Sequence, residues 1–138
     1  MSFSTTVTTW VNNRAVNRIR KGGSLMGMRL LVLNTVGKKT GAVRANPVAW
    51  FAGEDDSWLI VASAGGAPKN PAWFYNIGAH PEALSIDIGG SNVPVAASQL
   101  AGTDRASAWK SITTASPQFS KYESKTDREI PVIRLTRR

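Results

Sequence analysis

The sequence predicts a mainly β domain with flanking helices, in which about six antiparallel strands and three helices form a small barrel closed on itself. Short runs rich in β-branched and aromatic residues recur along the chain and are separated by tight turns, which is typical of antiparallel neighbours. The helical segments are too few to cover both faces of an open sheet, so closure into a barrel is the favoured arrangement. The length of 138 residues suits one compact domain.

The first predicted element is an amphipathic helix over residues 1–23. Apolar side chains recur there at helical spacing, as in Phe3, Val7 and Trp10, while basic and amide side chains fall largely on the other side. This helix either packs on the domain, covers a pocket, or makes peripheral contact with a membrane surface. Residues 24–138 then form the barrel domain.

Three strands are predicted next, over residues 29–36, 42–51 and 57–64, joined by a GKKTG turn and an AGEDD turn. Pro47 lies inside the second of these runs. Because proline donates no ladder hydrogen bond, we expect a sheet edge, a bulge or a ligand at this point.

The second half of the chain begins with a short helix, which Asn70 can cap and Pro71 can start. A hairpin over residues 82–88 and 92–99 follows. Thr103 is predicted to cap a helix that runs to about residue 114. A polar and aromatic segment then leads to a last strand over residues 129–136.

Charge is concentrated in the first third of the chain. Lys and Arg outnumber Asp and Glu by 17 to 9, which gives a net charge of +8, and the first acidic residue is Glu54. Such a field attracts nucleic acid, an anionic membrane or a ligand that carries phosphate or carboxylate groups. Nucleic-acid modules usually interleave exposed aromatic residues with the cations, a pattern that this sequence lacks, so we expect no nucleic-acid partner.

The residue types also limit the chemistry. With no cysteine and a single histidine, His80, the chain lacks thiolate sites and the multi-histidine sites typical of zinc, and we expect no metal. Redox chemistry would therefore need an organic cofactor. No signal peptide and no spanning run of roughly 18 apolar residues is recognisable, which predicts a cytoplasmic protein, with association at the inner face of the membrane as an alternative.

Two segments are candidate ligand sites. The GKKTG turn is no P-loop, because Val32 stands where that motif needs glycine and a strand follows instead of a helix. Lys38, Lys39 and Arg44 nevertheless form a compact cationic cluster, which is either a solvated hairpin tip or an anion site. The second segment, ASAGGAPKNP over residues 62–71, combines small residues with a helix start, so a flat anionic ligand could approach closely.

Three ordered strings, LLVLNTVGKKTGAVRANPVAWF, VASAGGAPKNPAWFYNIGAHPE and KYESKTDREIPVIRL, resemble the deazaflavin (coenzyme F420)-dependent nitroreductase family. The resemblance covers nearly the whole chain after about residue 28. It implies a split β-barrel related to flavin-mononucleotide-binding oxidases. It also implies the cofactor F420, an 8-hydroxy-5-deazaflavin with a phosphate and an acidic tail.

Position by position, the resemblance places a set of residues at the cofactor. Those expected at the phosphate are Lys38, Lys39, Thr40 and Arg44; those expected at the ring are Asn46, Pro47, Ala62, Ser63, Ala64 and Gly65; Trp73 and Asn76 would complete the pocket. The family commonly has lysine where this chain has Ala64. Nitroimidazole-reducing members place three tyrosines over the substrate, and the matching positions here are Ser116, Phe119 and Tyr122.

The resemblance therefore implies a coenzyme F420H2-dependent reductase. It would transfer a hydride from the reduced deazaflavin to a small electron-poor acceptor such as a quinone, a nitroaromatic or an α,β-unsaturated lactone. Ser63 and Tyr122 are the candidate catalytic residues, and the proton could come from Tyr122, Ser63 or solvent. Two alternatives stay open: an enzyme that uses flavin mononucleotide on the same barrel, and a non-catalytic deazaflavin carrier.

Overall fold

The computed structural model describes residues 29–138, so the helix predicted over residues 1–23 lies outside the described part of the chain. The strands are β1 (Leu30–Val36), β2 (Val43–Ala49), β3 (Phe51–Ala52), β4 (Trp58–Val61), β5 (Ser85–Ile88), β6 (Ser91–Gln99) and β7 (Val132–Arg137). The α-helices are α2 (Ala72–Ala79), α3 (Gly102–Ala115) and α4 (Gln118–Ser124), and the short 3-10 turns are η1 (Glu54–Asp56), η2 (Ala64–Gly66) and η3 (Pro81–Ala83).

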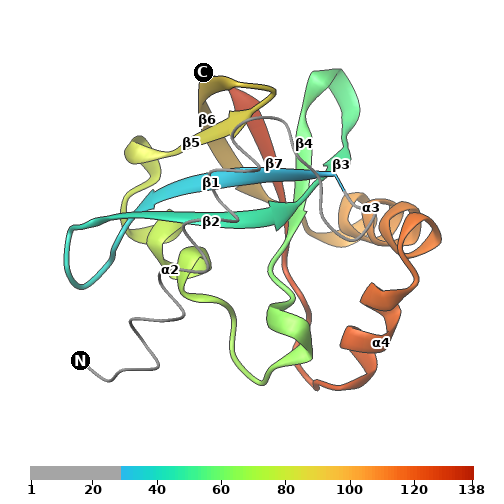
Figure 1. The fold of residues 1–138 in the computed structure, drawn as a ribbon. Helices are drawn as coiled ribbons and strands as arrows, with labels where there is room; N and C mark the ends of the chain where they lie inside the picture. The colour runs from blue at the N-terminus through green and yellow to red at the C-terminus, as the bar shows by residue number, and fades with distance from the viewer. Residues whose placement is uncertain (1–28) are drawn as a thin grey trace.

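All seven strands belong to one antiparallel sheet in the order β2-β1-β5-β6-β7-β4-β3. Its two edge strands, β2 and β3, are consecutive in the chain and are separated only by Trp50, whose N–H donates to the carbonyl of Arg29 (3.1 Å). Because one extended stretch supplies both edges, the sheet must curl round on itself, as Figure 1 shows. The predicted barrel is confirmed, and the single strand expected over residues 42–51 is divided in two at Trp50.

The strands alternate between two apolar clusters, as the two-residue period of a strand requires. On β4, Trp58 and Ile60 point into the barrel interior, together with Leu31, Leu33 and other buried residues of β5, β6 and β7. Leu59 and Val61 belong to a second cluster with Ile112 of α3 and Phe119 of α4. Both faces of β4 are therefore covered, which explains its uninterrupted run of apolar residues.

The helices lie at two places around the barrel (Figure 1). α2 packs on β1, and α3 and α4 pack on each other, with α3 also against β7 and α4 against η2. α4 is a helix where the sequence indicated only a polar and aromatic segment. The helix starts also differ slightly: Pro71 and Ala101 occupy the N-cap positions of α2 and α3, where Asn70 and Thr103 were expected to cap.

Candidate active site

A cavity of about 300 Å³ opens between the edge strand β2, the loop after β4 and helix α4. It contains seven of the residues that the sequence placed at the site: Pro47, Ser63, Ala64, Gly65, Trp73, Phe119 and Tyr122. Leu30, Val48, Ala49, Val61, Pro71 and Gln118 complete its lining. Segments far apart in the sequence thus meet at one cavity.

The first side of the cavity is the end of β2. Among residues 29–138, β2 is the outermost strand of the sheet beside β1, so Pro47 lies on an edge strand of this part of the chain. This is the position that a sheet tolerates for proline. Of the sheet edge, bulge or ligand expected at Pro47, the described part of the chain has the edge.

The second side is the loop over residues 62–70. Backbone φ is −76° at Ser63 and then positive at three successive residues, Ala64 (47°), Gly65 (65°) and Gly66 (84°). Glycine adopts positive φ without steric cost, whereas Ala64 does so at some strain. A Cβ added to Gly65 would meet no atom within 4 Å, so this part of the loop presents bare backbone to open space.

The third side is aromatic. Phe119 and Tyr122 are one helical turn apart on α4, and their rings meet edge to face with centroids 5.5 Å apart. Phe51 of β3 contacts Phe119 in the same manner at 5.7 Å. Phe119 is buried and Tyr122 is half-buried. The cavity therefore has one mostly apolar, aromatic side, which is supplied by α4.

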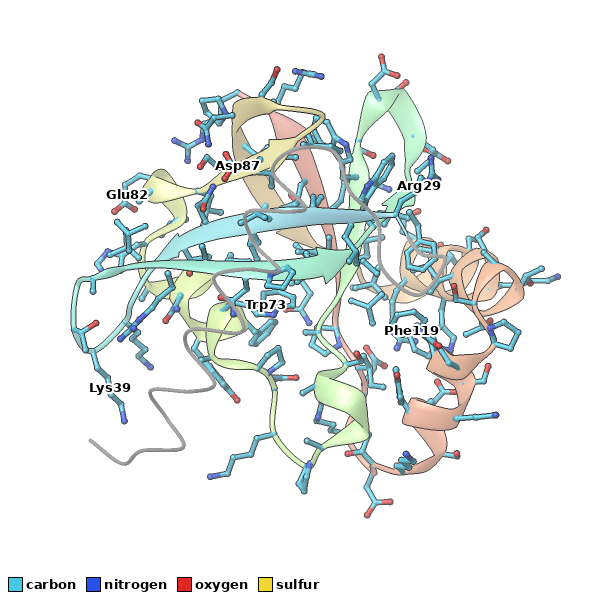
Figure 2. The ribbon with its side chains drawn as sticks, in the orientation of Figure 1. Arg29, Lys39, Trp73, Glu82, Asp87 and Phe119 are labelled. Atoms are coloured by element: carbon cyan, nitrogen blue, oxygen red, sulfur yellow. The ribbon has the colours of Figure 1, made fainter. Side chains whose placement is uncertain are left out.

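The cationic hairpin, residues 37–44, stands at the other end of β2 from the cavity. Lys38, Lys39, Thr40 and Arg44 are all exposed there. Figure 2 shows Lys39 at the outer tip, with Trp73 lying between it and Phe119 in that view. Arg44 and Pro47 are three positions apart, about 10 Å of extended strand, so an elongated ligand could span both places.

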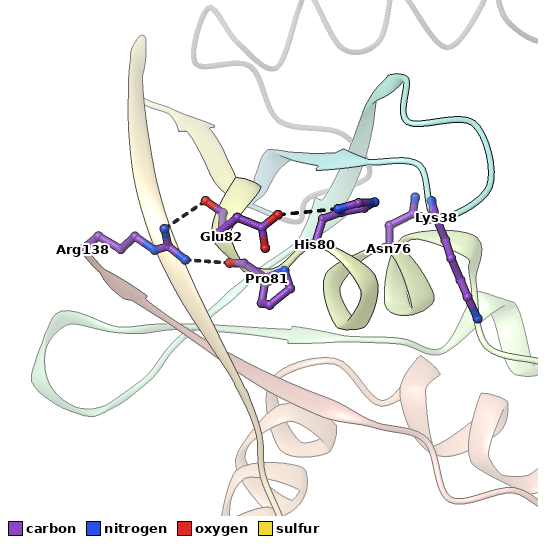
Figure 3. Close-up of polar contacts among 6 residues, drawn as sticks. All are labelled: Lys38, Asn76, His80, Pro81, Glu82 and Arg138. Carbon is purple, nitrogen blue, oxygen red and sulfur yellow. Dashed lines mark hydrogen bonds and ion pairs between the residues drawn. The ribbon is translucent and has the colours of Figure 1, made fainter.

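Asn76 of α2 anchors this hairpin. Its Oδ1 accepts a hydrogen bond from the backbone N–H of Lys38 (2.9 Å), and its Nδ2 donates to the hydroxyl of Thr35 (3.2 Å). Asn76 is itself buried. Figure 3 shows Asn76 beside Lys38. Past the end of the same helix, Arg138 donates to the carbonyls of Pro81 and Glu82. Asn76 thus holds the hairpin turn in place by hydrogen bonds, and it does not line the cavity.

Three other predicted residues also lie outside the cavity lining. Ala62 is fully buried in the barrel interior. Asn46 is half-buried and, by strand alternation, shares a face of β2 with Arg44 and Val48. Ser116 is the C-cap of α3, and its carbonyl accepts from the N–H of Phe119 (3.1 Å). Of the three positions matched to substrate tyrosines, only Phe119 and Tyr122 line the cavity.

Sequence reasoning missed Gln118, which lines the cavity beside Phe119. The signal was present in the spacing of Phe119 and Tyr122, which share a helix face, and in Pro117, which precedes the helix and is its N-cap. It also missed Leu30, Val48, Ala49, Val61 and Pro71. These are ordinary strand and loop residues, and only the curvature of the sheet brings them to the cavity.

The model of the F420H(2)-dependent quinone reductase family matches residues 6–137. The chain belongs to this family. An F420H(2)-dependent quinone reductase of Mycobacterium tuberculosis (strain ATCC 25618 / H37Rv) is 37% identical over 111 residues, which make up 78% of this chain and 73% of that protein. The recognition of a deazaflavin-dependent family is therefore confirmed.

Solved structures agree with this F420H(2)-dependent quinone reductase assignment. A structure of an F420-H2 dependent reductase (FDR-A) is 35% identical, has a TM-score of 0.68, and covers 78% of this chain and 93% of its own. A second structure, described as a domain-swapped dimer, is 33% identical, has a TM-score of 0.69, and covers 94% of this chain and 98% of its own. The predicted split barrel is thus confirmed.

The geometry of this family member fits a deazaflavin. The cavity is bordered by aromatic rings and by bare backbone at Gly65, as a flat tricyclic ring needs. The exposed cations of the hairpin offer donors to an anionic tail. No helix among residues 29–138 has the length and apolar character needed to cross a bilayer. Peripheral membrane contact was predicted from residues 1–23, outside the described part, and stays a prediction.

Proposed function

We propose that this chain is an F420H2-dependent reductase that passes a hydride to a small, flat, electron-poor acceptor, with a quinone as the first candidate. Family membership supports the cofactor class and the reaction class. The observation that carries the proposal is the cavity of about 300 Å³ at one end of β2 together with the exposed cationic hairpin at the other. A ligand with a ring at one end and negative charge at the other matches both ends of this strand.

When bound, the reduced deazaflavin supplies the hydride, and the chain orients and shields it. In this proposal Pro47 and the loop backbone at residues 63–65 hold the ring. Lys38, Lys39 and Arg44 attract the anionic part of the cofactor. Phe119 and Tyr122 then hold the acceptor flat and keep water away from the reacting atoms, which favours transfer at near-attack distance.

The acceptor side is more apolar than a site lined by three tyrosines would be. Phe119 has no hydroxyl, and Ser116 does not line the cavity. When a site has few hydrogen-bond donors, few of its polar groups are left unpaired by an apolar substrate. Such a site therefore binds apolar electron acceptors without loss of affinity. We therefore favour an apolar quinone over a polar nitroimidazole; simpler nitroaromatics and conjugated lactones are further candidates.

Tyr122→Phe tests whether the Tyr122 hydroxyl, one of the candidate proton sources, donates the proton. This change keeps the ring contact with Phe119 and removes only the hydroxyl, so we expect turnover to fall about 100-fold or more while cofactor affinity is unchanged. Steady-state turnover with a soluble quinone and a separate cofactor titration measure the two effects. Tyr75→Phe is the matched control, because Tyr75 is the other tyrosine of the chain and is exposed on α2. Full turnover in Tyr122→Phe would leave Ser63 or solvent as the proton source.

Lys39→Ala and Arg44→Ala test the proposed binding mode. Each removes one exposed cation, so we expect the dissociation constant of oxidised F420 to rise about 2- to 12-fold, with the difference shrinking at high salt. Quenching of tryptophan fluorescence provides the measurement, because Trp73 lines the cavity. Lys110→Ala, an exposed lysine on α3, is the control.

The same titration with flavin mononucleotide separates the alternatives. Tighter binding of flavin mononucleotide would overturn the deazaflavin assignment and favour a flavin enzyme on this barrel. Tight deazaflavin binding without turnover of any quinone, nitroaromatic or enone would favour a carrier. If both Lys39→Ala and Arg44→Ala bind oxidised F420 with unchanged affinity, the hairpin is not part of the binding site.

A further inference from the structure

The loop that forms one side of the cavity has little local support for its shape. Within it, the N–H of Gly66 donates to the carbonyl of Ser63 (2.9 Å), and the N–H of Ala67 donates to the carbonyl of Ala64 (3.1 Å). The left-handed conformation at Ala64 is unfavourable for a residue with a Cβ. Such a conformation persists only where surrounding structure holds it in place.

A single side chain from a distant part of the sequence provides that support. Arg128, between α4 and β7, uses all three of its guanidinium nitrogens on this loop. Nε donates to the carbonyl of Ala67 (3.0 Å) and Nη2 to the carbonyl of Ser63 (2.8 Å). Nη1 donates to the carbonyl of Ala62 (3.2 Å) and to Oδ1 of Asn70 (2.7 Å). The four bonds reach both ends of the loop, so they fix the span between them.

Arginine is specifically suited to this position. Its planar guanidinium presents donors in several directions at once, whereas the ammonium of lysine is a single nitrogen on a flexible stem. All four acceptors are neutral oxygens. The contacts between basic and acidic side chains found among residues 29–138 join His80 to Glu82 and Arg105 to Glu129, and neither includes Arg128. The guanidinium is therefore used for its geometry rather than for pairing with a carboxylate.

The loop is also held from its other side. Gly66 is buried, and a Cβ there would lie 2.8 Å from the carbonyl oxygen of Tyr122. The backbone of the loop thus rests directly on α4, which carries Phe119 and Tyr122. A shift of the loop would therefore also displace α4 and the Phe119 and Tyr122 rings that it carries.

We propose that Arg128 is a positioning residue that sets the conformation of residues 63–65 and thereby the fit of the cofactor ring in the cavity. The part of the proposal that concerns the ring rests on the proposed function. The part that concerns the loop does not, because the hydrogen bonds are made by the chain alone. Arg128 acts through the loop backbone and is not assigned any contact with the cofactor.

Arg128→Lys and Arg128→Met test this role, with hydrogen exchange measured on the full chain without cofactor. We expect exchange at the amides of Gly66 and Ala67 to quicken about tenfold or more in both variants, while amides of the central strands keep their protection. Arg105→Lys is the matched control, because Arg105 is half-buried and its Nη2 also donates to a carbonyl, that of Ile130 (2.8 Å), away from the cavity. It should leave the loop amides unchanged.

Cofactor titration and turnover then separate positioning from stability. For both Arg128 variants we expect the dissociation constant of F420 to rise about tenfold and turnover at saturating cofactor to fall, with Arg105→Lys unaffected. Wild-type loop exchange or wild-type affinity in Arg128→Lys would overturn the proposal, because charge alone would then suffice. Equal acceleration of exchange over the whole sheet would also overturn it. If the wild-type chain binds no F420, the proposed function fails, while the exchange data still decide the role of Arg128 in the loop.

Discussion

Phe119→Ala is expected to lower the free energy of unfolding by about 3 to 5 kcal/mol, as truncation of a buried aromatic residue does. Phe119 is 5% exposed and belongs to the apolar cluster between the sheet and α3. Its ring meets Phe51 and Tyr122 edge to face, at 5.7 Å and 5.5 Å. Truncation to alanine would remove both aromatic contacts and leave a cavity under α4.

Urea unfolding of the purified chain measures this loss. Phe119→Leu retains most of the apolar volume and should lower the free energy of unfolding clearly less. Tyr75→Ala truncates an exposed aromatic residue and should change that free energy by less than about 1 kcal/mol. We also expect the KM for the acceptor to rise more than the dissociation constant of F420. A loss below about 1 kcal/mol in Phe119→Ala would contradict the close packing of α4 on the barrel.

Gly66→Ala is expected to destabilise the chain by about 2 to 5 kcal/mol, from the sum of backbone strain and steric overlap. Gly66 has φ of +84°, where a residue with a Cβ is strained. The added Cβ would also lie 2.8 Å from the carbonyl oxygen of Tyr122 and 3.0 Å from Cβ of Lys125. Because these neighbours are backbone and the base of a side chain, α4 and the loop must move apart to make room.

Gly65→Ala is the matched control for this prediction. Gly65 also has positive φ, +65°, but a Cβ there would meet no atom within 4 Å, so only the strain of about 1 to 2 kcal/mol applies. The difference between the two variants in urea unfolding measures the contact between the loop and α4. Equal losses would show that the contact relaxes without cost, and they would weaken the link between the loop and the aromatic side of the cavity.

Several features could be predicted from the sequence because they depend on local patterns. The apolar residues of β4 and β7 and the short turns follow from properties of single segments, and Pro47 indicated an edge, a bulge or a ligand where the structure has an edge. The ordered motifs around the GKKTG turn and the 62–71 segment were specific enough to indicate the family, which the family match confirms. The roles of individual site residues stay proposals.

Helix α4 shows where local reasoning was insufficient. Its sequence, QFSKYES, is short and mostly polar, and isolated helices of this length are marginal in water. It is stabilised by burial of Phe119 against the barrel, which is a tertiary effect. Trp50 is similar: a single residue between two strands marks where the chain passes from one edge of the sheet to the other, and nothing in the local pattern indicates this break.

The sequence by itself determined the strand-rich character and the basic first third, because composition and short-range spacing are enough to define them, and its ordered motifs indicated the family by resemblance. Only the tertiary structure decided which residues meet. Asn76 lies against the hairpin, and Arg128 contacts the 62–70 loop. Ala62 and Ser116 do not line the cavity. Contacts such as that between Arg128 and Ser63 join positions 65 residues apart, and they depend on the closure of the barrel rather than on any local preference of the chain.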